Sequence, residues 1–188
     1  MSETGAPPRS LLVVAAVLAT ALAATVAVLG LVLSPGESER SEPERDGSGD
    51  DPTGPLALVT IPAPDADSAA CRDLVGAAPE RLKSSGEQLS RRELAEPAPP
   101  ATLAWGGDPI VLRCGLDRPP ELTRSSTLRA IDEVQWLPVP GDGSTTWYAV
   151  DREVYVALTV PDTAGTGPLQ TVSRTIADVL PAVPLDFE

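Results

Sequence analysis

One stretch constrains this chain more than any other feature: Leu11–Leu33, with the sequence LLVVAAVLATALAATVAVLGLVL. It carries no charged residue, and Thr20 and Thr25 are its only polar side chains. As a helix it would be about 34 Å long, enough to cross a hydrocarbon core of about 30 Å. A helix also bonds its backbone polar groups internally, as lipid requires. We therefore predict a transmembrane helix that ends before Ser34-Pro35-Gly36.

A cleaved signal peptide is the alternative to a retained anchor, because Ala21-Leu22-Ala23 has the small-x-small pattern of a cleavage site. The apolar run continues beyond that site to Leu33, which favours retention, although cleavage near Ala23 stays open. A buried helix of a soluble protein is the third reading, and the run is too long and too evenly apolar for it. The short segment Met1–Ser10 is expected to be cytoplasmic, so the remainder would lie outside.

The residues after the anchor fall into a linker and a domain. Ser34–Gly54 holds seven acids and two arginines among Ser, Gly and Pro, with no apolar side chain to bury. Such a segment cannot offset its ordering entropy, so we expect a disordered acidic tether. Residues 55–188 have the length of one ordinary domain. The predicted organisation is therefore a cytoplasmic segment 1–10, a transmembrane helix 11–33, a linker 34–54 and an extracytoplasmic domain 55–188.

Charge and composition exclude several functions. The formal net charge of −13 opposes nucleic-acid binding, which needs a basic surface. The absence of His removes the Ser-His-Asp and Cys-His constellations and most zinc sites. The only lysine, Lys83, precedes Ser84 and Ser85, and adjacent residues rarely form a catalytic dyad. We expect no cofactor and no metal site.

The two cysteines, Cys71 and Cys114, both lie on the side predicted to be outside. Because that side is oxidising, they are expected to form a disulfide. A redox-active pair is the alternative, and the CxxC spacing that would support it is absent.

Hydrophobic periodicity predicts an α+β domain. A helix is expected from Ala69, with Cys71, Leu74, Val75 and Ala78 on one face. A second helix is expected from Pro168 to Leu180. Together with the strands we predict an antiparallel sheet of five or six strands with both helices packed on it. The expected strand segments are Leu56–Ile61, an edge strand at Gln88–Leu94, two strands within Thr102–Gly115, and Ile131–Pro138, Thr145–Val150 and Glu153–Val160. The register of the last two strands predicts a core stripe on one face, made of Trp147, Ala149, Val154, Val156, Leu158 and Val160. By the same alternation Arg113 faces away from the core if Cys114 faces it.

Two runs carry a resemblance to a known family: W-G-G-D-P-I-V-L-R-C-G at Trp105–Gly115 and D-R-E-V-Y-V-A-L-T-V-P at Asp151–Pro161. With the anchor, the chain resembles an actinobacterial family of small single-pass membrane proteins whose extracytoplasmic domain has unknown function. A composition rich in Ala, Pro and Arg and poor in Lys suits that origin. The resemblance implies membrane location and supplies no activity.

Two sets of residues could carry chemistry. Trp105, Asp108 and Arg113 could line a small polar site beside an aromatic wall, whereas a turn-forming Asp108 and an Arg113 paired across the sheet are the structural alternative. Asp151 and Glu153 are two residues apart, and on one continuous strand their carboxylates could act together on a glycosidic bond. The alternative is that both flank a solvated turn.

Our sequence-based interpretation is a membrane-anchored extracytoplasmic interaction or binding module of the cell envelope, more consistent with a non-enzyme. It would contact the membrane through the N-terminal helix and bind an envelope protein or cell-wall component, with no nucleic acid. Two alternatives stay open: a glycan-active envelope enzyme using Asp151 and Glu153, and a structural subunit that pairs through its anchor.

Overall fold

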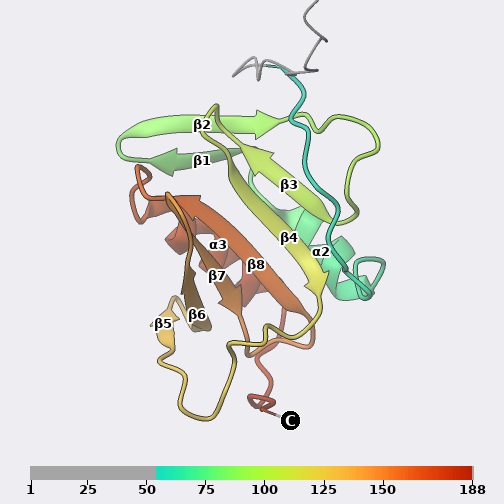
Figure 1. The fold of residues 1–188 in the computed structure, drawn as a ribbon, viewed down its shortest axis with the longest axis vertical. Helices are drawn as coiled ribbons and strands as arrows, with labels where there is room; N and C mark the ends of the chain where they lie inside the picture. Colours follow the sequence, from blue (N-terminus) through green and yellow to red (C-terminus); the bar gives the residue numbers. More distant parts are fainter. Residues whose placement is uncertain (1–53, 188) are drawn as a thin grey trace, which may run out of the picture. The chain divides into compact units, whose positions relative to one another are not determined.

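The computed structural model describes residues 54–187 of the chain (Figure 1). The chain divides into two units, Met1–Gly47 and Ser48–Glu188, and every described residue belongs to the second. Its strands form one antiparallel sheet of eight strands in the order β1-β2-β3-β4-β8-β7-β6-β5. The strands are β1 (Arg81–Ser84), β2 (Glu87–Arg92), β3 (Thr102–Trp105), β4 (Ile110–Leu116), β5 (Arg129–Ile131), β6 (Val134–Pro140), β7 (Ser144–Ala149) and β8 (Tyr155–Pro161).

The predicted count of five or six strands is wrong. The prediction missed β1 and β5, each of which is short and joined to its neighbour by a two-residue turn. Asp132 and Glu133 form the second of these turns with φ of 44° and 64°, a conformation for which Asn-Gly or Asp-Gly would be the usual signal. The expected first strand at Leu56–Ile61 is instead extended chain with a single bridge between Leu56 and Leu94.

The predicted transmembrane helix is not part of the observed fold. No helix within residues 54–187 is long and apolar enough to cross a membrane. The stretch Leu11–Leu33, on which that prediction rested, and residues 34–53 of the predicted linker lie outside the described residues.

Both helices lie behind the same face of the sheet in Figure 1. Helix α2 (Ala69–Ala77) begins after Ser68, whose Oγ accepts a hydrogen bond from the Cys71 amide at 3.1 Å. Helix α3 (Gly167–Val179) carries Pro168 in its first turn and buries Leu169, Val172 and Ile176. These residues confirm the two helices and the faces predicted for them.

The main core fills the space between this face and the two helices. It contains the predicted stripe of β7 and β8, with Ala149, Val156 and Leu158 fully buried. Cys71 of α2 and Cys114 of β4 are joined by the predicted disulfide, with their Cα atoms 5.5 Å apart. The disulfide therefore ties a helix to one of the central strands of the sheet.

Irregular segments cover parts of the opposite face, which we call the outer face. Leu56 and Leu58 pack against Ala104 and Val111 near β3 and β4. A second apolar cluster lies beside β6 and β7 and includes Leu122, Leu137, Tyr148 and the C-terminal residues Leu185 and Phe187. The sheet thus has apolar contacts on both sides, while the large core lies on the helix side.

Candidate functional site

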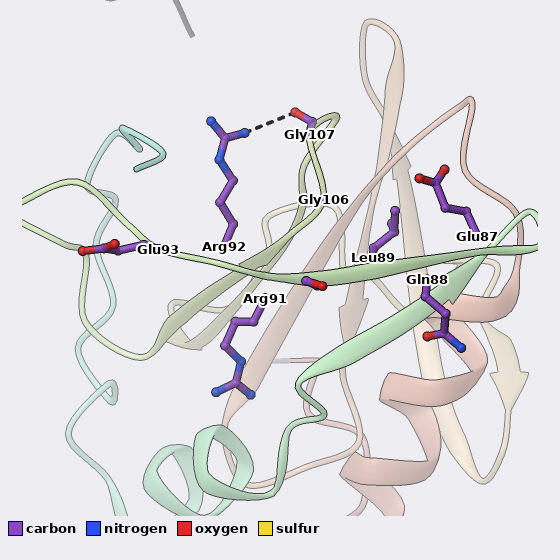
Figure 2. A pocket seen from close by; sticks show the side chains of 9 residues that line it. Glu87, Gln88, Leu89, Arg91, Arg92, Glu93, Gly106 and Gly107 are labelled. Carbon is purple, nitrogen blue, oxygen red and sulfur yellow. Dashed lines mark hydrogen bonds between the residues drawn. The ribbon is translucent and has the colours of Figure 1, made fainter. Parts of the chain in front are cut away.

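A hollow of about 350 Å³ follows β2 along its whole length. Figure 2 shows Glu87, Leu89 and Arg92 pointing to the side of β2 on which the Gly106-Gly107 turn lies. Gln88 and Arg91 point to the opposite side. We call this hollow the β2 hollow; its lining residues are Glu87, Gln88, Leu89, Ser90, Arg91, Arg92, Glu93, Gly106 and Gly107.

A second hollow of about 390 Å³ adjoins the first and shares Glu87, Leu89 and Gly107 with it. It lies among three turns: the turn between β1 and β2, the turn between β3 and β4, and the segment between β8 and α3. We call it the turn hollow. Besides the shared residues it is lined by Ser84, Ser85, Asp108, Pro161, Thr163 and Ala164.

The turn between β3 and β4 shapes both hollows. Gly106 has φ of 81°, and a Cβ atom placed there would lie 3.2 Å from a methyl carbon of Leu89. A side chain at this position would therefore be strained and would press against Leu89. Asp108 is held at the end of the turn, because its Oδ2 accepts a hydrogen bond from the Thr163 hydroxyl at 2.8 Å.

Arg91 and Arg92 hold β2, the strand that lines the β2 hollow, against neighbouring segments. Arg91 forms an ion pair with Glu80 at 3.2 Å and donates to the carbonyl of Ala78 at 2.6 Å. Arg92 donates from Nε to the carbonyl of Gly54 at 2.8 Å and from a terminal nitrogen to that of Gly107 at 3.2 Å. Both guanidinium groups therefore hold chain segments around β2.

Of the three residues proposed to share a polar site, only Asp108 lines one of these two hollows. Trp105 is fully buried, donates from Nε1 to the carbonyl of Pro79 at 2.9 Å and has Arg91 5.9 Å from its ring centre. It belongs to the main core, so no aromatic wall faces solvent at this position. Trp136 is fully buried too, and donates to the Ser173 hydroxyl at 2.9 Å.

Arg113 lies on the outer face, away from the helix side that holds Cys114, as the strand alternation predicted. Its contact is long, 3.4 Å from a terminal nitrogen to the carbonyl of Val59, and its buried Nε has no hydrogen-bond partner within the described part of the chain. Burial lowers the pKa of the guanidinium, against the influence of nearby Tyr148. Arg113 and Asp108 are therefore not brought together.

The carboxylates of Asp151 and Glu153 have different surroundings. Asp151 is buried; its Oδ2 accepts from the Gln135 amide at 3.1 Å, and its Oδ1 lies 2.9 Å from the Arg152 guanidinium, an ion pair without hydrogen-bond alignment. Arg152 is buried as well and donates to the carbonyl of Glu133 at 2.9 Å. Glu153 is exposed and precedes β8. One carboxylate is thus occupied internally, and the other faces water.

Sequence reasoning missed Glu87 and Leu89 as site residues. The charge of this strand indicated a sheet edge, but β2 is second from the edge, and its unpaired groups arise because β3 pairs with it only at Arg91 and Arg92. The sequence does not reveal that Gly107, Pro161 and Thr163 also line this site, because they belong to segments separated from β2 in the chain. Within residues 54–187 no group of three or more potential metal ligands occurs.

Comparisons with known proteins identify the family of this chain but assign it no activity. No curated protein and no solved structure matches the chain. The family described as "Protein of unknown function (DUF3515)" matches residues 12–185, which covers the stretch from the apolar segment to the end of the sheet-and-helix domain. By this match over most of its length, the chain belongs to the DUF3515 family.

Proposed function

We propose that this protein is an interaction module of the cell envelope, held at the membrane by Leu11–Leu33 with its disulfide-bonded domain on the extracytoplasmic side. One observation carries the binding role: two adjoining hollows open beside β2, whose edge toward β3 is only partly paired. The disulfide supports the location, since such bonds persist in oxidising compartments.

The partner is proposed to be a protein rather than a small molecule. The two hollows are partly open to solvent, are built from a strand edge and three turns, and share Leu89. Small-molecule sites are typically concave pockets that enclose most of the ligand. A strand edge instead offers backbone hydrogen bonds to another chain.

The glycan-active alternative receives no support from the geometry. A pair of carboxylates that acts on a glycosidic bond must flank the same bond from an open cleft. Asp151 is 6% exposed and paired with Arg152, so it cannot reach a substrate without breaking a buried ion pair. Neither Asp151 nor Glu153 lines the two hollows.

Photo-crosslinking in the native membrane tests the proposal. A photoreactive amino acid would replace the exposed Gln88 beside the hollows, and the same amino acid would replace the exposed Asp142 in the β6–β7 turn as a matched control. We expect a discrete adduct with an envelope protein from position 88 and none from position 142.

The same adducts from both positions, or no adduct from position 88 at several expression levels, would contradict a protein-binding role for this surface. Arg113→Ala provides a further comparison on the outer face, where we expect the adduct from position 88 to persist.

A further inference from the structure

The backbone of β2 presents a short unpaired edge. Ser85 and Gly86, with φ of 48° and 89°, form a two-residue turn that makes Ser84 and Glu87 a hydrogen-bonded pair. Alternation then turns the amide and carbonyl of Gln88 and the amide of Ser90 away from β1. Consistent with this alternation, the Ser90 carbonyl points outward and accepts from the Gly106 amide at 3.1 Å.

Strand β3 does not cover this edge. It pairs with β2 only at Arg91 and Arg92, after which the chain turns away through Gly106. Among the described residues, no backbone group bonds the amide or carbonyl of Gln88 or the amide of Ser90. Edge groups of this kind are a template for pairing with another extended chain.

Side chains beside the edge define what could lie there. Leu89 is half-buried and supplies an apolar surface common to both hollows. Glu87 is exposed, also lines both hollows and has no ion pair within the described residues. The guanidinium groups of the two β2 arginines, Arg91 and Arg92, are held by Glu80 and by backbone carbonyls. The available charge beside Leu89 is therefore negative.

We propose that β2 binds an extended segment of the partner protein as an added antiparallel strand, with an apolar side chain over Leu89 and a lysine or arginine beside Glu87. This inference rests on the proposed function and specifies its mode of recognition. In an antiparallel addition, the residue opposite Gln88 receives both backbone bonds. Its two neighbours then lie on the Leu89 and Glu87 side, which gives the order apolar-x-basic.

The chain's own acidic segment does not fit this requirement. Residues 34–53 contain no apolar side chain, and their charges are mostly of the same sign as Glu87. The formal net charge of −13 for the whole chain further favours a basic partner.

Synthetic peptides test the inference on the full-length protein in detergent micelles. The probe is a fluorescent peptide with the central sequence Val-Thr-Lys, and binding is measured by fluorescence anisotropy. Control peptides carry Val-Thr-Glu, the reversed order Lys-Thr-Val, or an N-methyl group on the central threonine. We expect the probe to bind about tenfold more tightly than each control. The Val-Thr-Glu peptide loses the charge contact with Glu87, the reversed peptide puts its apolar and basic side chains in each other's positions, and the N-methylated peptide loses one backbone hydrogen bond.

Variants of β2 separate backbone recognition from side-chain recognition. Gln88→Pro removes the outward amide, which no described residue uses, and Gln88→Ala removes the same side chain but keeps the amide. We expect about tenfold weaker probe binding for the proline variant than for the alanine variant. Glu87→Lys should reverse the preference between the Val-Thr-Lys and Val-Thr-Glu peptides. An intact Cys71–Cys114 disulfide and an unchanged thermal transition establish that each variant is folded.

Equal binding by the proline and alanine variants, or by the Lys and Glu peptides, would overturn strand addition at β2. If crosslinking from position 88 still captured an envelope protein in that case, the interaction module would stand and only the mode of recognition would fall. If the peptide results held while position 88 captured no protein, the proposed function would fall instead.

Discussion

At the scale of single residues, the most consequential finding is that Asp151 and Arg152 form a buried ion pair. Their side chains are 9% and 2% exposed, and the surrounding bonds reach Gln135 and Glu133 in and beside β6. A buried pair is a weak source of net stability, but removal of one partner leaves an uncompensated charge in the interior. This pair therefore joins the segment before β8 to β6 and explains the burial of two charged residues.

Replacement of Arg152 by alanine should lower the free energy of unfolding by about 3–5 kcal/mol, because the Asp151 carboxylate would stay buried without its counter-charge. Denaturant titration measures this change. Glu153→Ala is the matched control, and its effect should stay within about 0.5 kcal/mol because Glu153 is exposed. Comparable losses in both variants would contradict the structural role of the ion pair.

The raised pKa of Tyr148 predicts how the stability of the folded domain changes at high pH. Burial, assisted by Glu121, raises the pKa of its phenol above the ordinary value of 10.0, while Arg113 acts in the opposite direction. Because the folded state holds this proton more tightly than the unfolded state, the stabilising contribution is complete below pH 10.0 and is lost as pH rises through the folded-state pKa.

Above pH 10.0 we expect the free energy of unfolding to fall more steeply with pH in the wild type than in Tyr148→Phe. Urea titrations of both proteins over a series of alkaline pH values measure the difference. Tyr155, whose pKa burial and Asp186 also raise, serves as an independent comparison through Tyr155→Phe. A Tyr148→Phe protein with the same alkaline slope as the wild type would refute the assignment.

At the scale of secondary-structure elements, the disulfide is a covalent cross-link between side chains of the helix layer and the sheet. It joins α2 to β4 across a sequence separation of 43 residues, and both cysteines are fully buried. Chain-entropy arguments assign a loop of this length a stabilisation of about 4 kcal/mol. The helix α2 depends on this link more than α3 does, since α3 buries more apolar residues against the core.

The double variant Cys71→Ala, Cys114→Ala should lose about 4 kcal/mol in the free energy of unfolding. Chemical reduction of the wild type provides a control in which the sulfur atoms remain, and it should also lower the free energy of unfolding. Denaturant titrations under both conditions measure the effect. Wild-type stability in the double variant would show that noncovalent packing alone holds α2 in place.

The sheet also shows why short elements escape sequence analysis. Strands β1 and β5 have four and three residues, too few for hydrophobic alternation to be read. Their turns place Ser85, Asp132 and Glu133 at positive φ, where non-glycine residues give little warning. Because β1 pairs outside β2, the predicted edge strand at Gln88–Leu94 is second from the edge.

At the scale of the whole molecule, the unit Ser48–Glu188 contains all eight strands and both described helices. Its main core joins residues from α2, α3 and most strands into one cluster. A domain of this size with a continuous core usually unfolds as a single cooperative unit.

A chain that begins at Ser48 should therefore fold with the Cys71–Cys114 disulfide and show one thermal transition. Its midpoint should agree with that of the full-length protein in detergent, because every residue of the main core lies after position 48. Circular dichroism and calorimetry measure the two midpoints. A lower midpoint for the chain that begins at Ser48 than for the full-length protein would show that the core requires residues before Ser48.

The sequence alone determined the features that depend on local pattern or on few covalent options. These are the disulfide, the buried faces of the two helices, the core stripe of β7 and β8, and the outward direction of Arg113 from β4. Each follows from helical or strand periodicity, or from the presence of only two cysteines.

The tertiary structure alone decided the strand order and the site. The two hollows gather residues 84–93, 106–108 and 161–164, and no local pattern specifies that these segments meet. The same holds for the burial of Trp105 and of the Asp151–Arg152 pair, which depends on what packs over them from distant parts of the chain. Side-chain periodicity fixes the face on which a residue lies, whereas long-range packing determines whether that face meets solvent, a neighbouring segment or a partner.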